Sequence, residues 1–323
     1  MRPDLYQHAA IRDRKASENR PVIGEKSQNR LQAFGHSCHL VVNNNTDRGM
    51  ELLSLAQEEI QRLEIKFSAY QPDSIISQIN REAGTGAITP LDAESRSLFH
   101  YVSALWDESK HLFDPTTRLL QDCYDSEGYL LATQAQLQGI LKLVGWRHLE
   151  ISSEGVRLCE KGMLIDLNSC IRPYLIDSVR KILLKNGASN ALIEMDQDMS
   201  TIGKQPDGAN WLVGVRFPRG ARAAITRLKL NHQGFAIRGD FERAVMQGGE
   251  RFGRALSPID GQPIPGLLGV AVTADNCLTA CSAASVARLK TESAGLKWLA
   301  DLGLPWMAID RQLNCHGPLA PNN

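Results

Sequence analysis

The chain has 323 residues, of which 43% are hydrophobic and 22% are charged, a composition typical of globular proteins with a sizeable core. Lys plus Arg and Asp plus Glu number 36 each, so no excess charge favours nucleic acid or an acidic membrane surface as a partner. The first 30 residues lack the apolar core of a signal peptide, and the longest apolar runs are too short to span a bilayer. We therefore expect a mobile segment over residues 1–30, a folded unit over 31–315, and a cytoplasmic location without membrane contact.

In the first half of the chain, residues 47–67 give the clearest helical pattern. Their apolar residues recur on one face of a helix, at Leu52, Ala56, Ile60, Leu63 and Phe67. Further helices are predicted over 92–111, 135–145 and 175–186, and strands over 39–44, 148–152 and 155–167. The segment DLNSCIRPYLID (166–177) lies between a predicted strand and a predicted helix, so a turn is expected here: a nucleotide-binding turn, a damaged one or only a connection.

In the second half, strands are predicted over 190–195, 211–218, 224–231, 234–239, 266–274 and 305–310, and helices over 281–291 and 294–303. Helices thus come in pairs between groups of strands. Adjacent strands joined by short turns are mostly antiparallel, which predicts an α+β fold rather than a doubly wound sheet. A two-fold duplication of a strand–helix–helix–strand unit is compatible with this order.

The common catalytic and nucleotide-binding motifs are absent from the sequence. It contains no GxGxxG, GxxxxGK[ST], HExxH or GxSxG. Cys277 and Cys281 are spaced to share a helix face, but two thiols alone make a poor zinc site. We therefore expect no zinc.

Five short strings remain, and together they carry a resemblance. They are FSAYQPDSIISQIN (67–80), FDPTTRLL (113–120), IDLNSCIRPYLID (165–177), IRGDFER (237–243) and SPIDGQP (257–263). In order and spacing they resemble the FAD:protein FMN transferase family, the ApbE-like proteins. The resemblance extends over about residues 31–310.

The resemblance implies a duplicated T-fold-like α+β architecture, with antiparallel sheets and paired helices. It also implies a protein that binds FAD, cleaves its pyrophosphate with Mg²⁺ and attaches FMN to a Thr or Ser of an acceptor flavoprotein. The positions that match the family's motifs, or stand in for its phosphate-holding Lys, are the candidate flavin-binding residues: Tyr70, Ser74, Asp114, Asp166, Arg172, Gly239 and Asp240.

Several of these residues have a purely structural alternative. Tyr70 either covers an aromatic ring of the nucleotide or packs against the end of the first helix. Asp114 either accepts a hydrogen bond from a ribose or flavin group or caps its own turn. Gly239 and Asp240 either approach the ligand or form a turn at a helix start.

The third string departs from the family where a phosphate is expected. Asn168 and Ser169 replace two glycines, which removes backbone freedom and adds bulk. Pro173 replaces a further glycine and removes one backbone N–H. Arg172 replaces a lysine, keeps the positive charge and is able to bind a phosphate through two hydrogen bonds.

Further departures change the charge of the site. Glu194 and Asp196 lie where the family has neutral residues, and they either face solvent or oppose an anionic ligand. Arg254 replaces a histidine, and Ser257 replaces an aspartate.

Cys281 and Ser285 replace the Asp and Thr that hold Mg²⁺ in the family, and a thiol is a poor ligand for this ion. We assign no catalytic residue and no metal ligand, and consider Mg²⁺ doubtful. The hypotheses are a flavin-nucleotide-binding relative with impaired transfer, a non-catalytic binder of a flavin, another nucleotide or a partner protein, a fully active transferase, and a purely structural protein.

Overall fold

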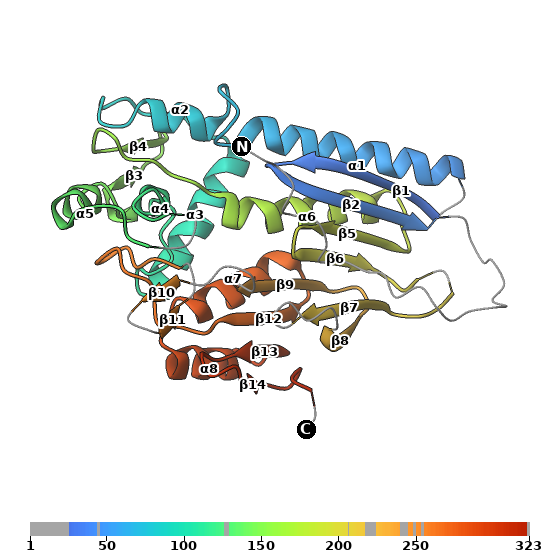
Figure 1. Ribbon diagram of the computed structural model, residues 1–323. Helices are drawn as coiled ribbons and strands as arrows, with labels where there is room; N and C mark the ends of the chain where they lie inside the picture. The colour runs from blue at the N-terminus through green and yellow to red at the C-terminus, as the bar shows by residue number, and fades with distance from the viewer. Residues whose placement is uncertain are drawn as a thin grey trace.

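One eight-stranded antiparallel sheet forms the centre of the molecule (Figure 1). The computed structural model describes residues 26–43, 46–125, 129–205, 207–216, 224–239, 245–247, 250–252 and 255–321. In their order across the sheet, the strands are β1 (Lys26–Ala33), β2 (His36–Asn43), β5 (Ala191–Met195), β6 (Asp198–Ile202), β9 (Gly234–Gly239), β12 (Gly269–Ala274), β13 (Trp306–Ile309) and β14 (Cys315–His316).

The order of elements repeats between the two halves of this sheet. The first half runs β1, β2, helix α1 (Thr46–Phe67), helix α6 (Asn168–Lys185), β5 and β6. The second half runs β9, β12, helix α7 (Cys277–Arg288), helix α8 (Glu292–Asp301), β13 and β14. Antiparallel pairing of β6 with β9 joins the halves. The predicted antiparallel α+β fold with paired helices is confirmed.

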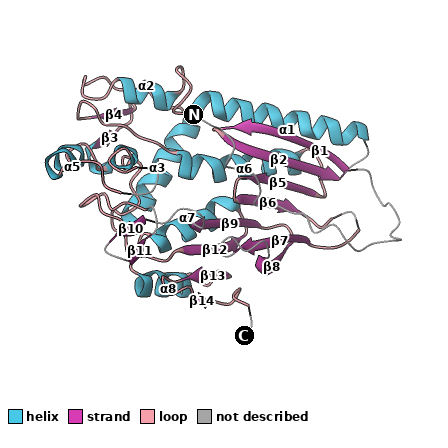
Figure 2. Cartoon of the chain, in the orientation of Figure 1, coloured by secondary structure: helices cyan, strands magenta, loops and turns pink. Residues whose placement is uncertain are grey.

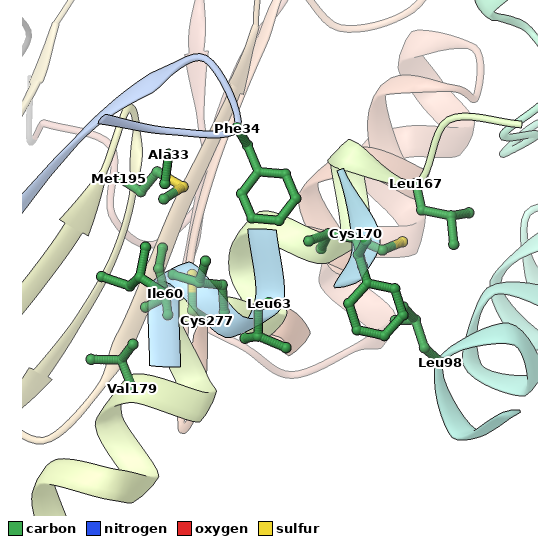
Figure 3. Packing of buried hydrophobic residues seen from close by; sticks show 14 of the residues in the cluster. Ala33, Phe34, Ile60, Leu63, Leu98, Leu167, Cys170, Val179, Met195 and Cys277 are labelled. Carbon is green, nitrogen blue, oxygen red and sulfur yellow. The ribbon is translucent and has the colours of Figure 1, made fainter. Parts of the chain in front are cut away.

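The helices cover one face of the sheet. Leu63 of α1, Val179 of α6 and Cys277 of α7 belong to one buried cluster that also includes Phe34 from the β1–β2 turn (Figure 3). A second cluster packs α7 and α8 against β9, β12 and β13. On the opposite face, the hairpin of β7 (Trp211–Arg216) and β8 (Ala224–Leu230) packs on the sheet. Both faces of the sheet are therefore buried.

Two insertions gather at one end of the sheet, on the left of Figure 2. Between α1 and α6 lie α2 (Ile75–Arg81), α3 (Ala93–Glu108), α4 (Arg118–Gln121), α5 (Gln134–Leu141), a 3₁₀ turn (Trp146–His148), β3 (Leu149–Ile151) and β4 (Val156–Leu158). Between β9 and β12 lie β10 (Val245–Gln247) and β11 (Glu250–Phe252). In the described part of the chain, no helix is both long and apolar enough to cross a membrane.

The prediction for α1 is confirmed, since all five apolar residues of its predicted face are buried. Strand β1, however, begins at Lys26, inside the segment 1–30 that was expected to be mobile. Strand β6 and helix α2 were not predicted at all.

The strand predicted over 155–167 is mostly wrong, because only Val156–Leu158 form a strand. Further along, the side chain of Asn80 takes the place of a strand partner for Ile165. Its Nδ2 donates to the Ile165 carbonyl at 3.0 Å, and its Oδ1 accepts from the Ile165 N–H at 2.8 Å. A single side chain thus satisfies backbone groups that a ladder would otherwise pair.

Candidate functional site

A pocket of about 370 Å³ lies between the first insertion and the ends of α6, β9 and α7. The loop 112–118, with Asp114 in it, forms one wall, and Asp166, Asn168 and Ser169 form another. Further lining comes from Arg238 at the end of β9, from Ser285 and Arg288 of α7, and from Ala255 and Leu256 of the second insertion. This volume lies within the range of small-molecule sites.

Asp114 lines the pocket, but its carboxylate is already saturated with hydrogen bonds. Oδ1 accepts from the N–H and the hydroxyl of Thr116, at 2.9 and 2.6 Å. Oδ2 accepts from Trp106 Nε1 at 3.2 Å and from the Trp146 N–H at 2.7 Å. Asp114 therefore holds α3, the pocket loop and the 3₁₀ turn together. This is the structural role considered above, because Asp114 caps its own turn, and it extends to two further elements.

Asp166 caps the start of α6, and the predicted turn over 166–177 is wrong. Helix α6 begins at Asn168, so most of that segment is helical, and Asp166 Oδ1 accepts from the Asn168 N–H at 2.8 Å. In the described stretch 163–186 no residue has a positive φ. A helical backbone needs no glycine, which explains why Asn168 and Ser169 are tolerated here.

Pro173 lies inside α6 and leaves the carbonyl of Ser169, four residues earlier, without a helical N–H partner. The thiol of Cys281 donates to this carbonyl at 3.4 Å. The substitutions at 173 and 281 are therefore complementary: one releases an acceptor and the other supplies a donor.

A largely buried arginine, Arg238, occupies the space beside Cys281. The guanidinium of Arg238 donates two hydrogen bonds to Asp198, at 2.6 and 2.8 Å, and one to Cys281 Sγ at 2.5 Å. Burial lowers the pKa of Arg238, but the charge of Asp198, the hydrogen bonds to it and the two nearby cysteines together raise this pKa well above its usual value. Burial raises the pKa of Cys281, so its thiol stays protonated. The Arg238–Asp198 ion pair therefore carries no net charge, and the Cys281 thiol beside it is uncharged.

This cluster does not fit a divalent metal ion. Mg²⁺ requires several oxygen ligands in octahedral geometry, whereas position 281 offers a protonated sulfur with a guanidinium against it. Among the residues that the structure describes, no group of three His, Cys, Asp or Glu side chains is placed to hold a metal.

Arg172 lies outside the pocket lining. Its Nη1 donates to Asp196 at 3.2 Å and lies 3.4 Å from Nε2 of His36, the first residue of β2. Asp196 has a φ of 56° and so adopts the left-handed conformation that a glycine readily takes. Arg172 and Asp196, two departures from the family pattern, thus pair with each other. Burial, followed by Arg172, lowers the pKa of His36.

Glu194 neither faces solvent nor lines the pocket. It is buried in β5, and its carboxylate lies 3.6 Å from His39 Nδ1 on the adjacent strand β2. The expectation that it either faces solvent or opposes an anionic ligand is wrong.

The remaining predicted site residues are spread around the pocket rather than brought together in it. Ser74 is fully buried and caps α2 by accepting from the Ser77 N–H at 3.0 Å. Tyr70 is 72% exposed, so it does not pack against the first helix. Gly239 pairs with Gly269 in the sheet. Asp240, like Arg254, lies outside the described residues.

The hydrogen bond to Asp122 raises the pKa of the pocket residue Arg118. Tyr70 does not line the pocket, and its ring is open to solvent.

Sequence reasoning missed Arg238, although its position carried a signal. In β9, Ala236 packs under α7, and Arg238 is two residues on and therefore on the same face. In β6, Asp198 shares the inward face with Ile202. A charged residue at an inward position in each of two strands indicates a buried ion pair.

The fold agrees with the comparisons to known proteins. The profile of the ApbE family matches residues 34–307, and the chain belongs to this family. It is 26% identical over 223 residues to the FAD:protein FMN transferase of Klebsiella pneumoniae (strain 342), covering 66% of this chain and 67% of that protein. It is 21% identical over 250 residues to the protein of the same name from Vibrio cholerae, covering 74% of this chain and 75% of the relative.

Solved structures share the fold. The ApbE protein of Thermotoga maritima superimposes with a TM-score of 0.78 at 23% identity, covering 91% of this chain and 97% of that one. The flavinyl transferase ApbE of Pseudomonas stutzeri, in its apo form, gives a TM-score of 0.77 at 21% identity, covering 89% and 91%. At these identities the likeness establishes the common architecture.

Proposed function

We propose that this chain is a flavin-nucleotide-binding member of the ApbE family in which FMN transfer is impaired. The observation that carries the proposal is the contact between the Arg238 guanidinium and Cys281 Sγ. The resemblance to the family implies a carboxylate that holds the metal at position 281. Without a metal, cleavage of the pyrophosphate loses a main source of charge stabilisation. The pocket nevertheless remains able to bind the flavin nucleotide.

The pocket supports binding of an anionic nucleotide. Arg118, Arg238 and Arg288 line it from three different elements, and the amino end of α6 opens onto it at Asn168 and Ser169. Helix amino termini and guanidinium groups both favour phosphate. We propose that FAD is the ligand, that Tyr70 covers a ring at the rim, and that Asp114 and Asp166 shape the wall.

Arg172 has a different proposed role. Arg172 pairs with Asp196 and does not line the pocket, so we propose that it binds a phosphate only after this ion pair breaks.

A fully active FAD:protein FMN transferase is the second candidate. It is favoured by the match to relatives of that name over about two thirds to three quarters of their length. In that case the chain transfers FMN to a Thr or Ser of an acceptor flavoprotein.

Two measurements separate these functions. The first is the visible absorbance of the purified protein, followed by a fluorescence titration with FAD, where saturable binding is expected. The second is the mass of an acceptor domain after incubation with FAD and Mg²⁺, with an active family transferase as the positive control. We expect no mass increase with this chain. An increase comparable to that of the control establishes the second candidate, and absence of FAD binding refutes the first.

A further inference from the structure

The Arg238 guanidinium lies in the middle of the polar groups at the base of the pocket. Nη1 donates to Asp198 Oδ1 and to the carbonyl of Ile237, and Nη2 donates to Asp198 Oδ2 and to Cys281 Sγ. Both terminal nitrogens are therefore committed to this cluster, and the guanidinium cannot turn away without breaking it.

The guanidinium directly contacts the Asp198 carboxylate, the Ile237 carbonyl and Cys281 Sγ, and the Ser169 carbonyl and the Ser285 hydroxyl contact Cys281 in turn. Asp198 supplies the negative charge and is fully buried. Cys281 accepts from the guanidinium and donates its own S–H to the Ser169 carbonyl, while its sulfur lies 3.9 Å from the Ser285 hydroxyl. A carboxylate, a carbonyl and a hydroxyl are oxygen groups that a hard cation prefers, but here a guanidinium provides the charge.

We propose that the Arg238 guanidinium, paired with Asp198, occupies the place of a divalent metal ion in this pocket, so that a phosphate-bearing ligand binds without a metal. The identity of that ligand rests on the proposed flavin-nucleotide function, whereas the exclusion of the metal rests on the geometry alone.

The exclusion has a simple electrostatic cause. A divalent ion near Cys281 meets the fixed charge of Arg238, while the one buried carboxylate of the cluster, Asp198, already holds both terminal nitrogens of that arginine. Restoring a carboxylate at position 281 is therefore insufficient, because it gives Arg238 a second anionic partner and leaves the centre occupied. A metal site requires removal of the guanidinium as well.

The test measures Mn²⁺ binding by electron paramagnetic resonance in four proteins: the native chain, Cys281→Asp, the double variant Arg238→Ser/Cys281→Asp, and the control Arg157→Ser. The control removes an arginine whose partner is Glu150 in the first insertion. We expect no binding below about 1 mM Mn²⁺ in the native chain, the control and Cys281→Asp. In the double variant, Asp198 and the introduced carboxylate are both available. We expect it to bind Mn²⁺ at least about tenfold more tightly than the native chain does.

Three results overturn the proposal: Mn²⁺ binding by the native chain, binding by Cys281→Asp, or a folded double variant that binds no better than the native chain. If the double variant does not fold, Mn²⁺ binding by the native chain and by Cys281→Asp still tests the proposal.

A titration of the native chain with FAD, with Mg²⁺ or with EDTA, then tests the consequence for the ligand. We expect the two affinities to agree within about twofold, and a loss of about tenfold in EDTA overturns metal-independent binding. Absence of any FAD binding refutes the proposed function, while the Mn²⁺ results still decide the place of Arg238.

Discussion

Two ionic clusters flank helix α6, and they differ in their contact with water. At the start of the helix, Arg238 pairs with Asp198, whose side chain is 0% exposed. Further along, Tyr174 donates to Glu94, which Arg62 and Lys66 also contact, and the Arg62 side chain is 45% exposed. The first cluster is largely closed off from solvent, since the Arg238 side chain is only 14% exposed, and the second lies at the surface.

This difference predicts opposite responses to mutation. Exposed ion pairs are screened by water and typically contribute less than about 1 kcal/mol. In a buried pair the favourable attraction offsets a large desolvation cost, so loss of one partner leaves an uncompensated charge. A buried pair adds little net stability compared with apolar residues, which is consistent with a positional role for Arg238. The following predictions test this contrast.

The largest effect is expected for Arg238→Ala, which leaves the Asp198 carboxylate buried and unpaired. We expect a loss of about 3–5 kcal/mol in the free energy of unfolding, measured by urea denaturation. The matched control is Lys66→Ala in the surface cluster, for which about 1 kcal/mol or less is expected, because Glu94 keeps its contacts with Arg62 and Tyr174. Equal losses in the two variants contradict the contrast.

Asp114→Ala is expected to cost about 2–3 kcal/mol, because it removes the acceptor for Trp106 Nε1, the Trp146 N–H and the Thr116 N–H. Thermal unfolding followed by tryptophan fluorescence measures this loss. Asp122→Ala serves as the control, since its carboxylate is exposed and its ion pair with Arg118 lies at the surface. A neutral Asp114→Ala variant refutes the structural role of Asp114.

Asp177→Ala tests the junction between the helices of the two halves. Asp177 on α6 accepts from the first N–H groups of α7, those of Cys277 and Leu278, at 2.9 and 2.8 Å. Loss of these bonds is expected to cost about 1–2 kcal/mol in chemical denaturation. Asn276→Ala removes only the bond to Thr279 and is expected to cost less. The reverse order contradicts this assignment.

The smallest effect is expected in acid at Glu94. Hydrogen bonds from Arg62, and then from Lys66 and Tyr174, lower the pKa of Glu94 from 4.5 to about 2. The folded-state pKa is depressed, so its stabilisation is present above about pH 4.5 and is lost as the pH falls towards 2. Because the cluster is screened, the contribution is below about 1 kcal/mol. Glu94→Gln should flatten the stability profile in this window, and an unchanged slope refutes the prediction.

The sequence predicted the elements with a strong apolar period. Helix α1 follows the spacing of its buried face, and the strands β2, β5, β9 and β12 follow their apolar runs. It failed at elements held by polar side chains. The Asn80 side chain, rather than a neighbouring strand, accepts from the Ile165 N–H. Asp166 accepts from the Asn168 N–H at the start of α6, before Pro173 in the chain.

The candidate site was predictable only in part. The motif order located the loop with Asp114 and the segment from Asp166, and both line the pocket. It also selected Ser74, which caps a helix away from the pocket lining, because a motif does not separate residues that bind from residues that support.

The sequence by itself determined the family, the antiparallel α+β architecture and the presence of a thiol at position 281, because these depend on pattern and residue identity. Only the tertiary structure decided what surrounds that thiol. Asp198, Arg238 and Cys281 are far apart in the chain, and the pairing of β6 with β9 beneath α7 brings them together. A contact between residues on separate elements depends on how those elements pack, and local sequence carries no direct record of it.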